Sequence, residues 1–313
     1  MYDLVCIGNP VYDLIETPYV KTHERVLSGC SVNAALTAKR LGLQRVALMG
    51  CAGGGLLKRL LSDLASHGLD ATYIKEGLDT GGFKLTYSPD LRSRKLEIIG
   101  GFEKVRPSDV PPELLDAKAI LIGPVMQEVD LELLEFVRRS SKAEVFLDPQ
   151  GLLRRTTPKG EVTLVREEWL REAVKLCDYV KPNEEEARVM TQMEEEDSAR
   201  ELRRWGAGVS IVTLAERGSV LYDGEKLYRV PAYRTRAIDP TGAGDVYAGA
   251  FIFIRLTGGD LLEAGLFASA IASIKVEHVG LDFLNFLEEG PRRARVLMNN
   301  YAGHSWPQEG HFT

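Results

Sequence analysis

One segment of the sequence combines glycines and carboxylates in a pattern suited to phosphate chemistry. It reads Asp239-Pro-Thr-Gly-Ala-Gly-Asp245 and runs into an apolar, helix-like stretch over residues 246–256. Glycines that open a helix leave backbone N–H groups unpaired at the positive end of the helix dipole, which favours anion binding. Asp245, just inside that turn, could accept the proton of a hydroxyl that attacks a bound phosphate. Taken alone, the segment also fits a tight turn with a first-turn acid.

Other phosphate-binding and metal-binding motifs are missing from the sequence. No Gly-x-x-x-x-Gly-Lys-Ser/Thr loop occurs, and the triple glycine at 53–55 lacks the Gly-x-Gly-x-x-Gly spacing of a dinucleotide fingerprint. The five histidines show no metal-ligand spacing. The four cysteines lack C-x-x-C spacing, which favours buried thiols in a reducing compartment over disulfides or a zinc site. Phosphate binding must therefore rest on the turn at Gly242.

Composition and length narrow the class of protein. The 313 residues carry 39 Lys and Arg against 45 Asp and Glu, for a net charge of −6. This balance argues against non-specific nucleic-acid binding, which requires an excess of cationic side chains. Apolar runs such as 248–254 fall well short of the roughly 18 residues of a membrane span, and the first residues do not resemble a secretion signal. We expect a cytoplasmic protein that acts on small molecules.

Hydrophobic patterning predicts an α/β fold. Short apolar runs alternate with stretches of helical period, the pattern of parallel strands joined by crossover helices. Helices are expected over 31–41 and 56–67, and strands at 4–8, 45–49, 119–122, 144–147, 179–181 and 209–213. Two stretches, 15–27 and 82–100, instead alternate with period two, which predicts half-exposed antiparallel strands that project from the sheet and could form a lid.

Several segments in chain order resemble the ribokinase (PfkB) family of carbohydrate and nucleoside kinases. The resemblance covers roughly residues 3 to 283. It implies a three-layer α/β sandwich with a mostly parallel central sheet and one kinase domain over 1–300, with lid strands at about 14–28 and 82–101. The last residues, 301–313, are polar and are expected to form a loosely held tail. The matching landmarks are Asp13, Ser28 to Asn33, the turn Gly50 to Gly53, Asn183 to Glu186, Thr213 to Gly218, and the Asp239 to Asp245 segment.

The resemblance also implies roles for individual residues. Asp245 would be the general base, and the amides of Gly242, Ala243 and Gly244 would stabilise the transferring phosphoryl group. The remaining roles are acceptor binding by Asp13, Gly29 and Asn33, nucleotide binding by Asn183, Thr213, Gly218 and Thr241, magnesium binding through water by Glu186, and a K⁺ ion near Asp239 and Thr241.

Three of these residues have a plainer alternative. Asp13 could be a strand-end turn residue, and Asn33 a satisfied polar group within its helix. Glu186 could belong to a solvated acidic helix face over 184–186. Two positions depart from the family pattern: Ser28 replaces the first glycine of a pair, and Gly54 stands where many members carry an aspartate, which leaves one acceptor contact in doubt.

A further segment bears on the acceptor. Asp148-Pro-Gln150, with Arg154 after it, and the stretch 123–128 resemble the archaeal and plant myo-inositol kinase branch of the family. Gln150 and Arg154 could therefore bind polyol hydroxyls or a phosphate. The alternative is an ordinary loop with a helix-capping Asp148 and a surface Arg154.

We therefore expect an ATP-dependent, Mg²⁺-requiring phosphotransferase that acts on a hydroxyl of a sugar or polyol, with myo-inositol among the candidates. The open alternatives are a nucleoside kinase of adenosine or cytidine type, a catalytically silent nucleotide-binding regulator, and an unrelated Rossmann-type enzyme. Expected partners are the small-molecule substrates, without nucleic acid or membrane, and the chain is expected to be a monomer or homodimer.

Overall fold

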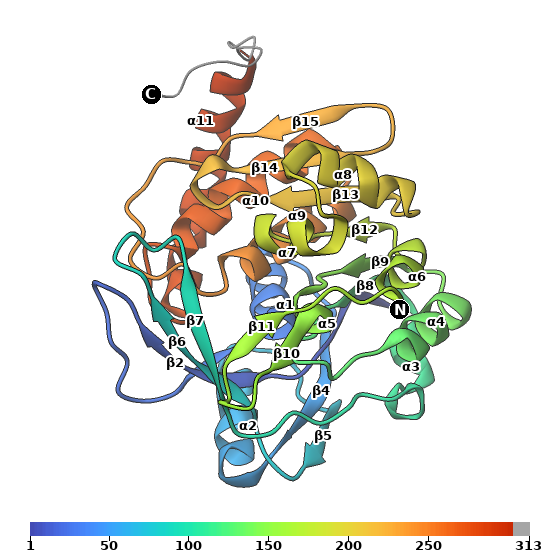
Figure 1. The fold of residues 1–313 in the computed structure, drawn as a ribbon, viewed down its shortest axis with the longest axis vertical. Coiled ribbons are helices and arrows are strands. Elements are labelled where there is room, and N and C mark those ends of the chain that lie inside the picture. The colour runs from blue at the N-terminus through green and yellow to red at the C-terminus, as the bar shows by residue number, and fades with distance from the viewer. Residues whose placement is uncertain (303–313) are drawn as a thin grey trace.

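A nine-stranded sheet forms the centre of the computed structural model, which describes residues 1–302 (Figure 1). Its strands run parallel from β5 to β13, and only β14 and β15 are antiparallel to their neighbours. The mostly parallel sheet expected from the sequence is thereby confirmed. In spatial order the strands are β15 (Leu227–Val230), β14 (Ser219–Tyr222), β13 (Val209–Thr213), β12 (Tyr179–Val180), β9 (Glu144–Leu147), β8 (Ala117–Ile122), β1 (Tyr2–Ile7), β4 (Val46–Gly53) and β5 (Ile74–Gly77).

Helices cover both faces of this sheet, because side chains of successive strand residues point to opposite sides. In β1, Leu4 and Cys6 join one buried cluster, whereas Val5 and Ile7 join the other. The first cluster is covered by α1 (Cys30–Leu41), α2 (Leu57–Ser66), α9 (Ala243–Leu256), α10 (Leu261–Lys275) and α11 (Gly290–Ala302). The second is covered by α3 (Pro112–Leu115), α4 (Leu131–Ser140), α6 (Leu170–Lys175), α7 (Glu184–Thr191) and α8 (Glu195–Arg204). The three-layer arrangement is confirmed.

A second sheet of four strands projects beside the first, where the sequence predicted a lid (Figure 1). Its order is β3 (Val26–Ser28), β2 (Val11–Glu16), β6 (Gly82–Tyr87) and β7 (Arg94–Ile99). The outer pairs are antiparallel as expected, but the expectation is wrong for the central pair, because β2 and β6 are parallel. Both strands follow parallel strands of the main sheet, β1 and β5, and leave it in the same direction. We call these four strands the lid sheet.

Two local expectations need correction. Residues 17–25 lie between β2 and β3 and hold one isolated bridge, so the strand expected over 15–27 occupies only its two ends. The turn expected at Gly50–Gly53 is instead the end of β4, because these residues pair in parallel with β5. A 3₁₀ turn at Gly54–Leu56 follows and leads into α2.

A short hairpin connects the main sheet to the lid sheet. Helix α5 (Gln150–Leu153) follows β9 and leads into β10 (Arg154–Thr156), which pairs with β11 (Val162–Leu164). The tip of this hairpin contacts β7, where the Ile98 N–H donates to the Gly160 carbonyl at 3.0 Å. The same loop that follows β9 therefore touches both sheets.

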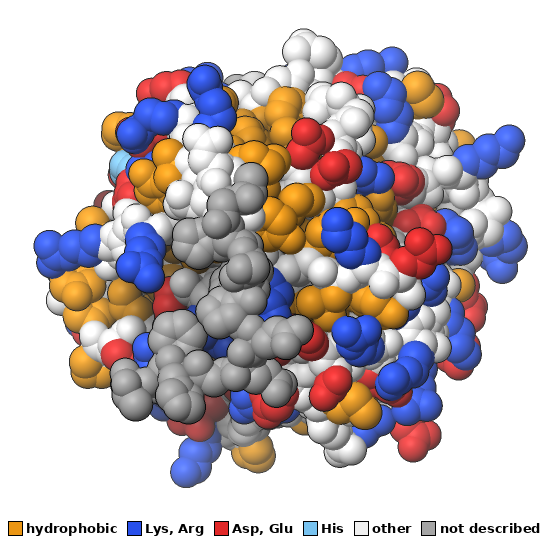
Figure 2. Space-filling view, turned by 90° about the horizontal axis from the view of Figure 1, so that it is seen from above, with side chains coloured by type: hydrophobic (Ala, Val, Ile, Leu, Met, Phe, Trp, Pro, Cys, Tyr) orange, Lys and Arg blue, Asp and Glu red, His pale blue; other side chains and the backbone are white. Residues whose placement is uncertain are grey.

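The surface and the chain end agree with the composition. Lys and Arg side chains are interspersed with Asp and Glu on the face shown in Figure 2. In the part of the chain that the structure describes, no helix is both long and apolar enough to cross a bilayer. All four cysteines are free and buried, as expected. Of the predicted tail, Tyr301 and Ala302 end α11, and 303–313 lie outside the described residues. The division into a kinase domain and a tail stays a prediction.

Candidate active site

The predicted site residues gather where the central parallel strands end. Asp148 follows β9, Lys181 follows β12, and the first turn of α9 lies against them. In open α/β sheets the carboxyl ends of the strands form the crevice in which ligands bind. The site therefore lies at the position that the fold favours, with the lid sheet beside it (Figure 1).

The anion turn, Gly242 to Gly244, has the conformation that the sequence suggested. Gly242 adopts a left-handed φ of 77°, and a Cβ there would lie 2.6 Å from Asn33 Nδ2, so only glycine fits. Within the described residues, the N–H groups of Gly244 and Asp245 make no backbone hydrogen bond. The N–H of Ala243 donates to Pro240 O at 3.2 Å. The predicted part of Ala243 in anion binding would require that bond to open.

Asp245 is held by two amide side chains from different elements. Its Oδ2 accepts a hydrogen bond from Asn33 Nδ2 of α1, and its Oδ1 accepts one from Gln150 Nε2 of α5, both at 3.0 Å. Burial raises the pKa of Asp245, and the negative charge of Asp148 adds to this, while the bonds from Asn33 and Gln150 and the charge of Lys181 oppose it. The carboxylate is fixed in place and is a stronger base than an exposed aspartate.

A buried ion pair adjoins the anion turn. Lys181 Nζ lies 2.8 Å from Asp148 Oδ2, and a Cβ on Gly244 would lie 3.4 Å from the same ammonium. Burial alone would lower the pKa of Lys181, but the charge and hydrogen bond of Asp148, together with Cys30 and the charge of Glu186, outweigh it and raise the pKa, so the side chain is charged. Sequence reasoning missed Lys181. Its signal is a single cation directly after the apolar β12.

Cys30 lies beside the two aspartates of the site. Its Sγ and one oxygen each of Asp148 and Asp245 lie within 4.8 Å of one another. Burial and the two carboxylates raise the pKa of the thiol well above its ordinary value. The thiol is therefore neutral and is neither a nucleophile nor a good metal ligand, since both roles require the thiolate.

Asp13 lies on the lid side of the site. Its Oδ1 accepts the Phe83 N–H at 2.8 Å, which joins β2 to β6. Burial raises the pKa of Asp13 to about 6, although the Ser28 hydroxyl, the Phe83 N–H and the Arg154 charge oppose the shift. Asp13 is thus a buried carboxylate that bridges two strands of the lid sheet. Gly29, also predicted for acceptor binding, precedes α1 with a φ of 114°.

Arg154 is buried, so the alternative of a surface arginine was wrong, although Asp148 Oδ1 does accept the N–H of Gln150 at the start of α5, at 3.3 Å. Its Nη2 donates to Gln150 Oε1 at 2.5 Å and its Nη1 to Val125 O at 2.9 Å, and the guanidinium lies 5.2 Å from the centre of the Phe83 ring. Gln150 therefore links Arg154 to Asp245. A cation, an amide and a carboxylate form one hydrogen-bonded chain along the site.

Three of the four residues predicted to bind nucleotide, Asn183, Thr213 and Gly218, lie after or at the ends of β12 and β13. Asn183 and Thr213 form a parallel bridge, and Leu214 N–H donates to Gly218 O at 2.8 Å to close the following loop. Asn183 also caps α7, because its Oδ1 accepts the Glu186 N–H and Glu186 Oε2 accepts the Asn183 N–H, both at 2.9 Å. These two residues thus have a structural role as well.

Glu186 is buried, so the solvated-face alternative is wrong for this residue, whereas the neighbouring Glu185 is exposed. Burial, followed by the charge of Asp148, raises the pKa of Glu186 to about 7. A cation beside it would relieve the cost of ionising a buried carboxylate. Glu186 is therefore suited to a site that receives positive charge.

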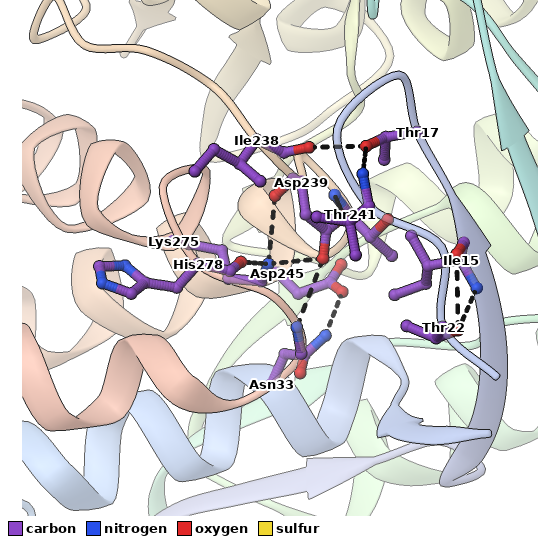
Figure 3. Close-up of polar contacts among 12 residues, drawn as sticks. Ile15, Thr17, Thr22, Asn33, Ile238, Asp239, Thr241, Asp245, Lys275 and His278 are labelled. Atoms are coloured by element: carbon purple, nitrogen blue, oxygen red, sulfur yellow. Dashed lines mark hydrogen bonds and ion pairs between the residues drawn. The ribbon is translucent and has the colours of Figure 1, made fainter. Parts of the chain in front are cut away.

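The lid sheet reaches the anion turn through side chains that sequence reasoning did not select. Tyr87 Oη lies 3.0 Å from Thr241 Oγ1, and Arg94 Nη1 donates to Tyr87 Oη at 3.2 Å. The Thr17 hydroxyl donates to Ile238 O at 3.0 Å (Figure 3). Thr241, predicted to bind nucleotide, is thus engaged with the lid sheet. The period-two pattern of β6 predicts which side chains lie on the same side of the strand, but not which residues they contact.

Comparison with known proteins places this site in a family. The model of the pfkB family carbohydrate kinases matches residues 1–286. A cytidine kinase of Thermococcus kodakarensis is 31% identical over 259 residues, which cover 80% of this chain and 88% of the relative. A nucleoside kinase of Methanothermobacter thermautotrophicus is 27% identical over 294 residues, covering 89% and 90%.

A solved structure shares the fold. A pyrophosphate-dependent kinase in the ribokinase family, complexed with a pyrophosphate analog and myo-inositol, aligns with a TM-score of 0.77 at 22% identity, covering 88% of this chain and 96% of that one. The family match spans the anion turn, Asp245 and both sheets. The chain is a kinase of the sugar and nucleoside class, and it belongs to the pfkB family of carbohydrate kinases.

Proposed function

We propose that the protein transfers the γ-phosphoryl group of ATP to a hydroxyl of a sugar or polyol, with Asp245 as the general base. One observation carries the proposal: Asp245 is buried beside the anion turn, and both its oxygens are fixed by Asn33 and Gln150. Each carboxylate oxygen has a second lone pair. The acceptor hydroxyl can therefore approach a base that is already oriented.

In the proposed reaction, the acceptor oxygen forms a bond to the γ-phosphorus as the bond to the ADP oxygen breaks. Asp245 takes the hydroxyl proton, and the free N–H groups of Gly244 and Asp245 donate to the phosphoryl oxygens. Lys181, beside Gly244, adds a positive charge where negative charge accumulates. The acceptor is bound by Asp13, Gln150 and Arg154.

Magnesium fits the nucleotide side of the site. Glu186 is a buried carboxylate, and among residues 1–302 only the Asn183 N–H donates a hydrogen bond to it. We expect Glu186 to hold the ion through water, where the ion would neutralise charge on the donor phosphates. The K⁺ expected from the family resemblance stays a prediction, and the place beside Asp239 already holds a lysine side chain.

A nucleoside acceptor is the second candidate. The cytidine kinase and nucleoside kinase relatives favour it, and a carboxylate such as Asp13 suits a ribose diol as well as a polyol. The polar lining by Asp13, Gln150 and Arg154 favours the sugar or polyol.

A substrate panel tests the proposal. ADP formation is measured with ATP and Mg²⁺ against ribose, fructose, myo-inositol, adenosine and cytidine. In a second series pyrophosphate replaces ATP as the donor, and the release of orthophosphate is measured instead. We expect turnover with a sugar or polyol and ATP, and none from the Asp245→Asn variant. Turnover with cytidine or adenosine alone would favour the nucleoside kinase. ATP binding without any turnover would favour the silent regulator.

A further inference from the structure

Lys275, the last residue of α10, carries a buried ammonium group directly behind the anion turn. Its side chain is 2% exposed. Nζ lies 3.2 Å from Asp239 O, 3.3 Å from Asp239 Oδ2 and 2.9 Å from His278 O (Figure 3). The mechanism proposed above does not use this group. The three oxygens that it contacts belong to Asp239 and His278, which are distant in the sequence.

The three contacts identify the group as a cation. A lysine ammonium has three N–H donors and no acceptor, and it meets three acceptor oxygens here. A neutral amine would turn its lone pair toward one of these oxygens. Burial lowers the pKa of Lys275, and the Asp239 charge opposes this shift. In the described part of the chain, Asp239 forms its only ion pair with Lys275, so the two charges compensate each other.

The pair is coupled to the anion turn. Asp239 Oδ1 accepts the Thr241 N–H at 2.9 Å, one residue before Gly242, while its Oδ2 faces Lys275. The N–H of Asp239 donates to Val276 O at 3.0 Å, and the Gly280 N–H approaches Oδ2 at 3.4 Å. The ammonium therefore joins the 238–242 segment to the 276–280 segment and holds the carboxylate that orients the turn.

We infer that Lys275 is a positioning residue whose ammonium takes the place of a free monovalent cation, so that this kinase works without K⁺. Two carbonyl oxygens and one carboxylate oxygen also form a set that suits K⁺ or NH₄⁺, but here a tethered cation occupies the set. The inference rests on the proposed role of the anion turn. It replaces the K⁺ ion expected near Asp239 and Thr241.

The unmodified enzyme provides the first test. ADP is quantified directly by chromatography, with tetramethylammonium as the only monovalent cation and then with K⁺ at equal ionic strength. We expect kcat and the KM for ATP to agree within about twofold, because the cation is already in place. A tenfold or larger rise in kcat with K⁺ would overturn the inference.

Paired substitutions provide the second test. Lys275→Ala vacates the space of the ammonium, whereas Lys275→Met removes the charge but fills much of the space. We expect both to lose at least tenfold in kcat/KM for ATP. NH₄⁺ or K⁺, but not tetramethylammonium, should restore the alanine variant in a saturable manner and leave the methionine variant unchanged. An alanine variant that folds and ignores NH₄⁺ and K⁺ would contradict the inference.

Thermal unfolding keeps this test independent of the proposed reaction. NH₄⁺ or K⁺ should raise the Tm of Lys275→Ala, relative to tetramethylammonium at equal ionic strength, even if no acceptor is found. Arg293→Met is the matched control, because Arg293 is also buried and pairs with Glu277 and Glu289 without touching Asp239. Its Tm should fall without any cation-specific recovery. If Lys275→Ala does not fold, the inference is tested by the first experiment alone, which compares kcat of the unmodified enzyme with and without K⁺.

Discussion

Two buried carboxylates, Asp245 and Asp13, differ in their hydrogen-bond partners. From this difference we infer different roles in the reaction. Asp245 accepts two side-chain amide donors, one from α1 and one from α5. Asp13, a residue of β2, accepts a backbone N–H from β6, which joins two neighbouring strands of the lid sheet. The first is arranged to take a proton at the anion turn, and the second to hold an acceptor between the two sheets.

Asp245→Asn should reduce kcat by about 10²–10⁴-fold, because the amide keeps the shape of the side chain but cannot accept the proton. The affinity for ATP should stay within a few-fold, since the backbone of the turn is unchanged. Steady-state kinetics and ATP titration check this. A variant that keeps more than a tenth of the turnover would contradict the general-base role.

Asp13→Asn should raise the KM for the acceptor by about 10²-fold, through loss of charged hydrogen bonds, with little change in the KM for ATP. The same variant should be more stable at pH 8. A rise in pKa from 3.8 to about 6 means that burying the ionised Asp13 costs on the order of 3 kcal/mol at that pH.

The pH dependence of this stability difference has a definite sign. Between pH 3.8 and about 6 the folded protein binds the Asp13 proton more tightly than the unfolded chain. The parent protein therefore gains stability from this group as the pH falls through that window. The Tm advantage of Asp13→Asn should shrink from pH 8 to pH 4. An advantage that grows on acidification would show that Asp13 is not buried as a costly anion.

At the scale of elements, the lid sheet contacts the segment that leads into α9 through side chains rather than through backbone pairing. Tyr87 of β6 contacts Thr241, and Arg94 of β7 supports Tyr87. Such contacts can open and close without breaking a strand ladder. Enclosing the site would exclude water that competes with the acceptor for the phosphoryl group.

The lid sheet should respond to the acceptor more than to the nucleotide. We expect the acceptor to slow backbone amide exchange in residues 82–100, and ATP alone to do so weakly. Tyr87→Phe removes the hydrogen bonds of the Tyr87 hydroxyl with Thr241 and Arg94, each worth about 1 kcal/mol, and should reduce this protection at least roughly fivefold. Tyr222→Phe, whose hydroxyl bonds to Gly224 far from the lid sheet, is the control. Exchange that ignores the acceptor would rule out a lid.

At the scale of the whole molecule, hydrophobic period was sufficient to predict the six central strands of the main sheet, but not its edge strands β5, β14 and β15 or its cross-connections. The apolar runs that became β1, β4, β8, β9 and β13 are short and continuous because both their faces are buried. The parallel pairing of β2 with β6 was not predictable from the hydrophobic period, because apolar and polar residues alternate in the same way in parallel and antiparallel strands. It depends on how two separate hairpins leave the main sheet.

The candidate site was predictable to the extent that it depends on local sequence. The turn at Gly242 and its carboxylate form one continuous segment, so residue types and spacing were sufficient. The Lys181–Asp148 and Lys275–Asp239 pairs join residues from different crossovers. A sequence shows that such cations exist, but only the folded chain shows which carboxylate each one meets.

The contact between the β10–β11 hairpin and β7 also bears on self-association. The outer strand of an open sheet carries unpaired backbone groups that can recruit a strand from another molecule. On β7 this edge is partly taken by Gly160, which accepts the Ile98 N–H, and by Glu161, which pairs with Lys95 at 2.6 Å. The hairpin is thus an intramolecular competitor, and a second copy could add to β7 only by displacing it. At the other edge, the three residues of β3 offer only a short template.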